Sequence, residues 1–136
     1  MATAPNFAGT PRVSWTTNIT AANTAKDGTG TVAAGFTAGA SGSRIEYIVG
    51  KPRGANIASL VRVFVNNGLT NATAANNSLL LDATTPAVAA LSEVAVMGEV
   101  WIPGNGLVLQ ANYVLNFVLA TAVAAGWHFT VVGADF

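Results

Sequence analysis

The sequence has no cysteine and very little charge. Its 136 residues include six Lys or Arg, six Asp or Glu and one His, so 9% are charged and the formal net charge is zero. The lack of cysteine excludes disulfides, thiolate metal ligands and a cysteine nucleophile. A charged fraction this far below the usual quarter argues against nucleic acid or an anionic membrane held by basic residues. We therefore expect neither as a partner.

Long hydrophobic runs are also scarce, although 51% of the residues are hydrophobic, because alanine supplies much of that fraction. The first eleven residues lack the basic start and the apolar segment of a secretory signal, so we expect no export by that route. Only the window 107–125 approaches the length of a membrane span. Gln110, Asn112 and Asn116 interrupt it, and no flanking Lys or Arg would orient it. We expect no membrane span.

Short strands separated by turn residues account for most of the chain. Residues 12–20 alternate Val13, Trp15, Thr17 and Ile19 with polar residues, which is typical of a half-buried strand with an apolar inner face. Residues 88–102 are ambiguous, because their alanines suit a helix and their valines suit strands; we expect mostly strand. The other expected strands are Thr31–Ala38, Arg44–Val49, Ile57–Val65, Ser78–Ala83, Leu107–Leu109, Tyr113–Ala120 and Trp127–Val132.

About eight short strands without a long amphipathic helix predict an all-β fold. We expect one antiparallel β-sandwich over residues 12–136, jelly-roll-like, because a jelly roll is a natural arrangement of eight strands. Pro5, Gly9 and Pro11 predict that residues 1–11 form an extended N-terminal arm. A lipocalin-like barrel or an immunoglobulin-like sandwich would give much the same pattern, so the sequence leaves the strand order open.

No motif for catalysis, metal binding or cofactor binding is present. The six carboxylates do not form the spaced pairs of a metal loop or a glycosidase, and we expect them to be solvated surface acids. His128, the one imidazole, lies in an expected strand, and no serine stands in a G-x-S-x-G setting. The glycine pairs 28/30 and 104/106 lack the lysine of a phosphate loop and predict turns. We expect no enzyme, no metal site and no cofactor.

Aromatic and basic residues supply the candidate contacts. The three tryptophans, Trp15, Trp101 and Trp127, could stack on a sugar or pack in a core or subunit interface; we favour packing for Trp15 and Trp127 because aliphatic residues flank them in strand patterns. Arg44, Arg53 and Arg62 are half of the basic residues and could pair with acids on a partner or form an ordinary solvent face. The candidate partner contacts are Phe7, Arg12, Arg44, Arg53, Arg62 and Trp101.

Several stretches of strand and turn resemble a known family. They are residues 44–48 (RIEYI), 60–68 (LVRVFVNNG), 70–77 (TNATAANN) and 126–136 (GWHFTVVGADF). Together they make the chain similar to the jelly-roll capsid cement, or decoration, proteins of tailed bacteriophages over about residues 12–136. None of these stretches carries a catalytic motif.

The resemblance implies a structural virion protein, made in the host cytoplasm and located on the outer capsid surface. Such a protein binds the outside of the capsid, cements neighbouring major capsid protein subunits and so stabilises the shell. The resemblance also implies self-association as a homodimer, with a trimer as the alternative. The other functional hypothesis is a carbohydrate-binding or tail-associated β-sandwich module that uses Trp101 and the Asn-rich loops.

Overall fold

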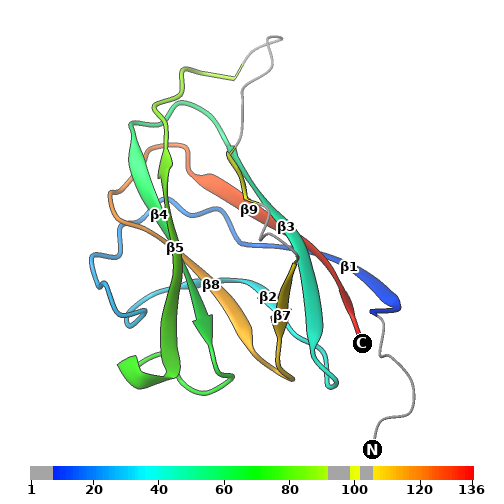
Figure 1. Ribbon diagram of the computed structural model, residues 1–136. Coiled ribbons are helices and arrows are strands. Elements are labelled where there is room, and N and C mark those ends of the chain that lie inside the picture. Colours follow the sequence, from blue (N-terminus) through cyan, green and yellow to red (C-terminus); the bar gives the residue numbers. More distant parts are fainter. Residues whose placement is uncertain (1–7, 92–98, 102–105) are drawn as a thin grey trace, which may run out of the picture.

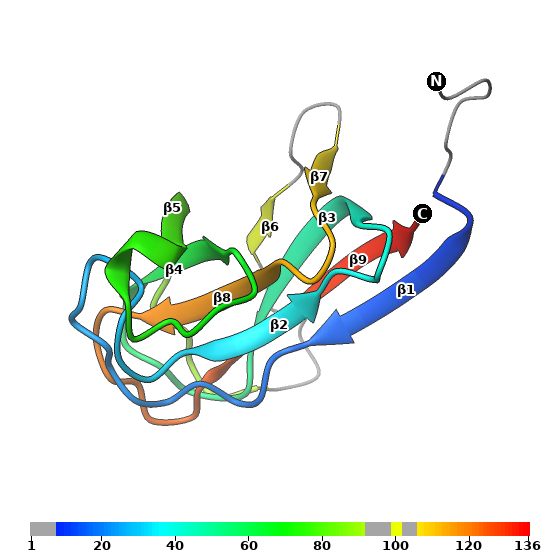
Figure 2. The ribbon, with the colours of Figure 1, turned by 90° about the horizontal axis from the view of Figure 1, so that it is seen from below.

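The computed structural model describes residues 8–91, 99–101 and 106–136. The described residues form strands and one 3₁₀ turn (Ala74–Asn76), with no α-helix among them. The strands are β1 (Thr10–Trp15), β2 (Ala33–Thr37), β3 (Ser43–Pro52), β4 (Ser59–Asn66), β5 (Asn77–Thr85), β6 (Glu99–Trp101), β7 (Leu107–Leu109), β8 (Val114–Leu119) and β9 (Trp127–Asp135). They build two antiparallel sheets that pack against each other (Figures 1 and 2).

The strand order is that of a jelly roll. Sheet A has the order β1-β9-β3-β6, with β7 also paired to β3, and sheet B has the order β2-β8-β4-β5. The first four strands pair in turn with the later ones: β1 with β9, β2 with β8, β3 with β6 and β7, and β4 with β5. The chain is thus one long antiparallel hairpin rolled into two sheets, with β6 and β7 as two pieces of one strand. This confirms the expected fold and settles the strand order that the sequence left open.

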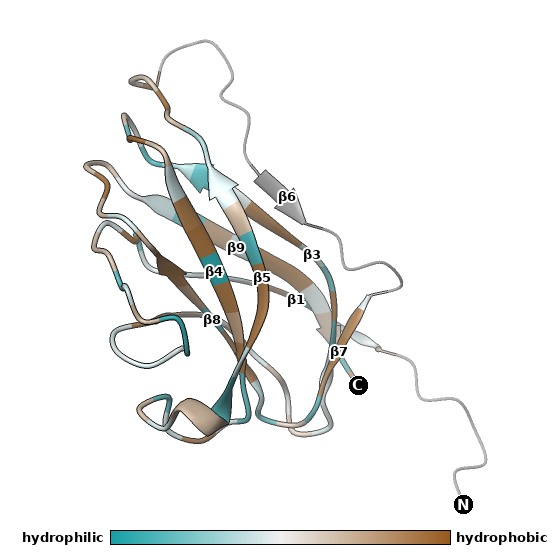
Figure 3. Ribbon diagram, turned by 60° about the vertical axis from the view of Figure 1, so that its left-hand side comes forward, coloured by the Kyte–Doolittle hydropathy of each residue, from teal (hydrophilic) through white to brown (hydrophobic). Residues whose placement is uncertain are grey.

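The core lies between the sheets and is made of aliphatic and aromatic side chains. Phe117 of β8 stacks on Phe129 of β9 with ring centroids 5.2 Å apart, and Trp127 stacks on Phe129 at 6.2 Å. These rings come from both sheets, so the stack joins the two layers through apolar contact. Figure 3 shows hydrophobic colouring along β4 and β8, in keeping with their buried positions. Trp127 is completely buried, which confirms the expected packing role.

Strand β1 departs from its predicted length and orientation. It spans Thr10–Trp15, so it begins two residues before the expected boundary of the arm and ends before Ile19, which forms only an isolated bridge to Trp127. The predicted inner face is wrong at Val13 and Trp15, which are 59% and 63% exposed. Arg12 points inward instead, because the pairing of β1 with β9 sets the register and thereby decides which alternate side chains reach the core.

A bulge in β3 explains a second difference. Simple alternation placed Ile45, Tyr47 and Val49 on one face, but the pairing with β9 shifts between Ile45 and Tyr47. The additional residue, Glu46, allows Ile45 and Ile48 both to be buried while Tyr47 points outward. By contrast β4, where Val61 and Val63 face the core and Arg62 faces out, follows the predicted alternation.

Two segments, 107–125 and 88–102, allowed more than one interpretation in the sequence. The uncharged window 107–125 forms β7 and β8, and no helix among the described residues is long and apolar enough to cross a membrane. Of residues 88–102, Val88 forms an isolated bridge with Asn56 and residues 99–101 form β6. Residues 92–98 and 102 lie outside the described part of the chain.

Candidate functional site

The outer face of sheet A carries a contiguous group of apolar side chains, here called the sheet A strip: Val13, Trp15, Tyr47, Val49, Val108 and Val132. Direct pairing places Val13 beside Val132 and Val132 beside Tyr47 in one row across three strands. Trp15 and Val49 flank Thr130 in the next row. Tyr47 is 38% exposed and Val108 63%. Exposed apolar side chains gathered on one surface are a common feature of protein surfaces that contact another molecule.

The two ends of the strip differ in charge. At one end Lys51 is paired across the strands with His128, and the exposed Arg53 follows the end of β3. Burial, and then the positive charge of Arg53, lower the pKa of His128 below its ordinary value, which favours the neutral imidazole. At the other end Arg44 donates a hydrogen bond to Glu46 over 2.8 Å. Lys51, Arg53 and His128 thus lie at one end of the strip, and the Arg44–Glu46 ion pair lies at the other.

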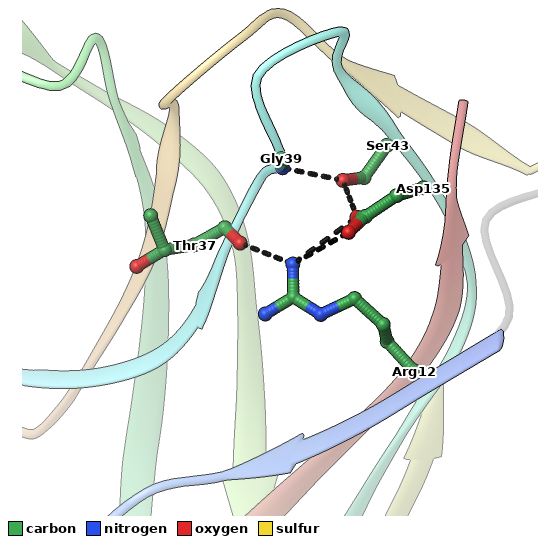
Figure 4. Close-up of polar contacts among 5 residues, drawn as sticks. All are labelled: Arg12, Thr37, Gly39, Ser43 and Asp135. Carbon is green, nitrogen blue, oxygen red and sulfur yellow. Dashed lines mark hydrogen bonds and ion pairs between the residues drawn. The ribbon is translucent and has the colours of Figure 1, made fainter. Parts of the chain in front are cut away.

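Behind the strip, Arg12 ties three parts of the chain together (Figure 4). Its Nη1 donates to both carboxylate oxygens of Asp135, at 3.1 and 3.2 Å, and to the carbonyl of Thr37 at 2.8 Å. The guanidinium also lies 4.6 Å from the ring centroid of Phe36, a cation–π contact. Arg12 thus links β1 to the end of β9 and to the end of β2, on the edge where the two sheets meet.

The carboxylate of Asp135 has a second partner. The Ser43 hydroxyl donates to it and in turn accepts the Gly39 amide at 3.0 Å. These contacts hold the pKa of Asp135 below its usual value: the Ser43 hydrogen bond has the largest effect, partial burial opposes it, and Arg12 adds to the lowering. Asp135 is therefore a structural acid, unlike the solvated carboxylate that the sequence predicted. Nothing in the sequence links residues 12, 43 and 135, which are brought together only by the strand pairing.

The other predicted contact residues occupy separate places. Arg62 on the outer face of sheet B lies 3.4 Å from Asp82 and is mostly buried, whereas Arg53 is exposed. Trp101 ends β6, where its backbone pairs with Ile48. Phe7 lies outside the described residues, and so does the side chain of Trp101. Among the candidates that the structure describes, Arg12, Arg44, Arg53 and Arg62 are not gathered into one site.

The asparagines of the loops are used within the protein. Asn77 donates to the carbonyls of Asp27 and Asn71, and Asn71 donates to the carbonyls of Gly28 and Gly30. These bonds join the loop after β1 to the loop between β4 and β5. Because their amides are already engaged, these side chains are less available for a sugar than the sequence suggested.

Two features of the described residues bear on metal and ligand binding. No group of three or more His, Asp or Glu among them could hold a metal ion. A hollow of about 170 Å³ lies between residues 17–23, residues 31–33 and β8, lined mainly by small side chains. Ligand pockets usually have 300–1,000 Å³, so this hollow is small for a sugar or a cofactor. A second hollow of about 510 Å³ is lined by Ala55, Asn56, Ile57, Val88, Ala122 and Ala124.

Comparisons with protein-family models, with curated proteins and with solved structures give no match. The functional argument therefore rests on the sequence and the geometry. Sequence reasoning missed the sheet A strip as a surface, although Val13 and Trp15 were visible as one side of an alternating strand. The sequence carries no local signal for this surface, because the inward side of β1 holds Arg12 and Ser14, which an alternating pattern assigns to solvent.

Proposed function

We propose that the protein is a structural virion protein of a tailed bacteriophage, which binds the outside of the capsid and cements neighbouring major capsid protein subunits. The observation that carries the proposal is the presence of exposed apolar side chains on several sides of a jelly roll with little charge. They include the sheet A strip, Leu79 on β5, and Ile57 and Leu69 in loops at the two ends of β4. A protein that bridges several neighbours needs more than one such surface.

The chemistry of these surfaces suits close contact with protein. With zero net charge and 9% charged residues, electrostatic capture of a partner is weak, and apolar contact and shape must supply affinity. Each contact can then be modest, because a protein bound to several subunits of one shell gains avidity from their fixed spacing. The resemblance to capsid cement proteins supports the same function and implies a location on the outer surface of the virion.

Co-sedimentation with phage shells stripped of their accessory proteins tests the proposal. We expect saturable binding at a fixed ratio to the major capsid protein, and a higher temperature of shell disruption when the sites are full. Mature and immature shells serve as parallel samples, because binding to expanded shells alone would place cementing after maturation. Absence of binding to every shell would refute the proposal.

One observation favours the carbohydrate-binding alternative. Trp15 is 63% exposed, and exposed aromatic side chains on β-sandwiches can stack on sugar rings. A glycan array with the wild-type protein and Trp15→Ala tests this function. Binding of a defined glycan that is lost in Trp15→Ala would favour the alternative over capsid cementing.

A further inference from the structure

We propose that the open edge of β5 is a docking site for an extended segment of the major capsid protein, which pairs with β5 as an additional strand of sheet B. The segment carries an apolar side chain beside Leu79 and a basic side chain beside Asp82. This site rests on the proposed function, because it names the part of the chain that contacts the capsid.

The edge of β5 is the longest unpaired strand edge that the structure describes. The two sheets are bounded by β1, by β6 with β7, by β2 and by β5. Strands β1 and β2 lie next to each other (Figure 2), and Arg12 of β1 donates to the Thr37 carbonyl at the end of β2. Strands β6 and β7 have three residues each, and so short an edge offers little template for pairing. By contrast β5 has nine residues, contains neither Lys nor Pro, and pairs with β4 alone among the described strands.

The direction of the ladder shows which backbone groups of β5 face this open edge. The Ala120 amide donates to the Leu60 carbonyl at 2.9 Å, so Leu60 bonds toward β8 and away from β5. Bonding direction alternates along an antiparallel strand, so every second residue of β4 after Leu60 does the same. The residues of β5 opposite them are Thr84, Asp82 and Leu79. Their N–H and C=O groups therefore point away from β4, toward the position of an incoming strand.

The side chains at the same positions indicate the chemistry of that strand. Leu79 is 45% exposed, and the side chain of Asp82 is 46% exposed. Arg62 of β4 lies 3.4 Å from Asp82 on one side, and a carboxylate can accept further donors on its other side. Opposite charges on neighbouring strands stabilise a sheet and like charges destabilise it. A basic residue beside Asp82 and an apolar residue beside Leu79 would therefore favour docking.

The bulge in β5 leaves a regular stretch for pairing. The register against β4 shifts between Val63 and Phe64, so Leu80 is an additional residue on β5. After it, Leu81–Thr85 pairs residue by residue with β4, over a length typical of a strand. In strand addition of this kind the backbone bonds supply affinity, and alternate side chains supply specificity.

Hydrogen exchange followed by mass spectrometry tests the site, with the full-length protein free and bound to mature phage shells stripped of their accessory proteins. In the free protein we expect fast exchange of the β5 amides that face the open edge, those of Leu79, Asp82 and Thr84. On the shell these amides should exchange more slowly, because they then donate to the backbone of the capsid segment.

Substitutions at the edge give a second measurement. Thr84→Pro removes a donor that faces the open edge and leaves the bonds to β4 in place, so it should lower the apparent affinity for shells at least about tenfold. Thr84→Val keeps both the amide and the branched shape, so it is the matched control and should bind as the wild type does. Leu79→Ser should weaken binding up to about fivefold, because it removes one cross-strand contact. Urea unfolding verifies that each variant is folded.

The outcomes separate this site from capsid binding in general. Full binding by a folded Thr84→Pro, or β5 amides that exchange equally fast on the shell, would overturn the site and leave capsid binding in place. Protection of the same amides in the free protein that grows with its concentration would show that a second copy occupies the edge, which would also overturn the site. Absence of wild-type binding to every shell would refute capsid binding itself, and the site with it.

Discussion

Replacing Asp135 by Asn tests whether the polar cluster around Arg12 holds the first strand in place. Strand β1 is at the edge of sheet A, and none of its residues belongs to the hydrophobic core cluster. Its attachment therefore depends on backbone pairing with β9 and on the contacts of Arg12. Asp135→Asn keeps the size of the side chain but removes the charge that binds Arg12 and accepts the Ser43 hydroxyl.

The expected cost is about 1–2 kcal/mol of the free energy of unfolding at pH 7. Hydrogen bonds to charged groups contribute about 1.5–3 kcal/mol when protected from water. The side chains of Arg12 and Asp135 are 32% and 22% exposed, so solvent screening reduces this value toward the 1 kcal/mol of a surface ion pair. For a chain of this length the corresponding fall in Tm is roughly 4–8 °C.

The pH dependence gives a second readout. Because folding lowers the pKa of Asp135, its charge stabilises the native state above the ordinary value of 3.8, and this stabilisation is lost as the pH falls through the lowered folded value. The asparagine variant lacks this titration. The difference in unfolding free energy between wild type and variant should therefore be full at pH 7 and should shrink as the pH falls below about 4.

Urea unfolding followed by fluorescence at several pH values measures both effects. The control is Glu46→Gln, which also removes one carboxylate from an arginine pair but at a more exposed site, and it should cost no more than about 0.5 kcal/mol. Equal stability of Asp135→Asn and wild type at pH 7, or a gap between them that stays constant down to pH 2, would refute the reasoning.

Three further substitutions test the core, the sheet and a loop, each by urea unfolding. Phe117→Ala should cost about 3–5 kcal/mol, because it removes the fully buried ring that sheet B contributes to the stack between the sheets. Gly133→Ala should cost about 1–3 kcal/mol, because a Cβ there would overlap the Arg44 carbonyl on the neighbouring strand, and an unchanged stability would show that β3 moves aside easily. Asn56→Ala should cost about 2–4 kcal/mol, because the buried amide accepts the amides of Ala125 and Gly126 and donates to the Gly126 carbonyl. Asn18→Ala, at an exposed residue with one bond to the Ala125 carbonyl, is its control and should cost less than about 1 kcal/mol.

Local patterns in the sequence were sufficient to predict the class of fold and most strands. The run 57–65 alternates bulky apolar residues with a period of two, and Asn66, Asn67 and Gly68 end it, so β4 could be placed within two residues at its start and one at its end. The same holds for β8, whose Leu115 and Phe117 face the core. These features depend only on neighbours along the chain, which is why they are visible in one sequence.

Features that depend on distant pairing could not be predicted. The bulge at Glu46 arises from the register of β3 against β9, and it reverses the faces of Tyr47 and Val49 relative to simple alternation. The partner of Arg12 lies 123 residues away. The composition indicated a surface with little charge. Neither composition nor alternation could show which side chains form the sheet A strip, because neither says which face of a strand is buried.

Arg12 points inward and Trp15 points outward for the same reason, which is the register of β1 against β9. A slip of β1 by one residue would turn Val13 and Trp15 toward the core and would move Arg12 into solvent. Burial of apolar surface contributes about 25 cal/mol for each Å², so the free chain forgoes a substantial gain by leaving Trp15 63% exposed. The contacts of Arg12 with Asp135 and Thr37 hold the observed register and keep Trp15 outside. The polar contacts of Arg12 therefore decide which face of β1 is buried, although the apolar alternation of this strand alone would favour the opposite face.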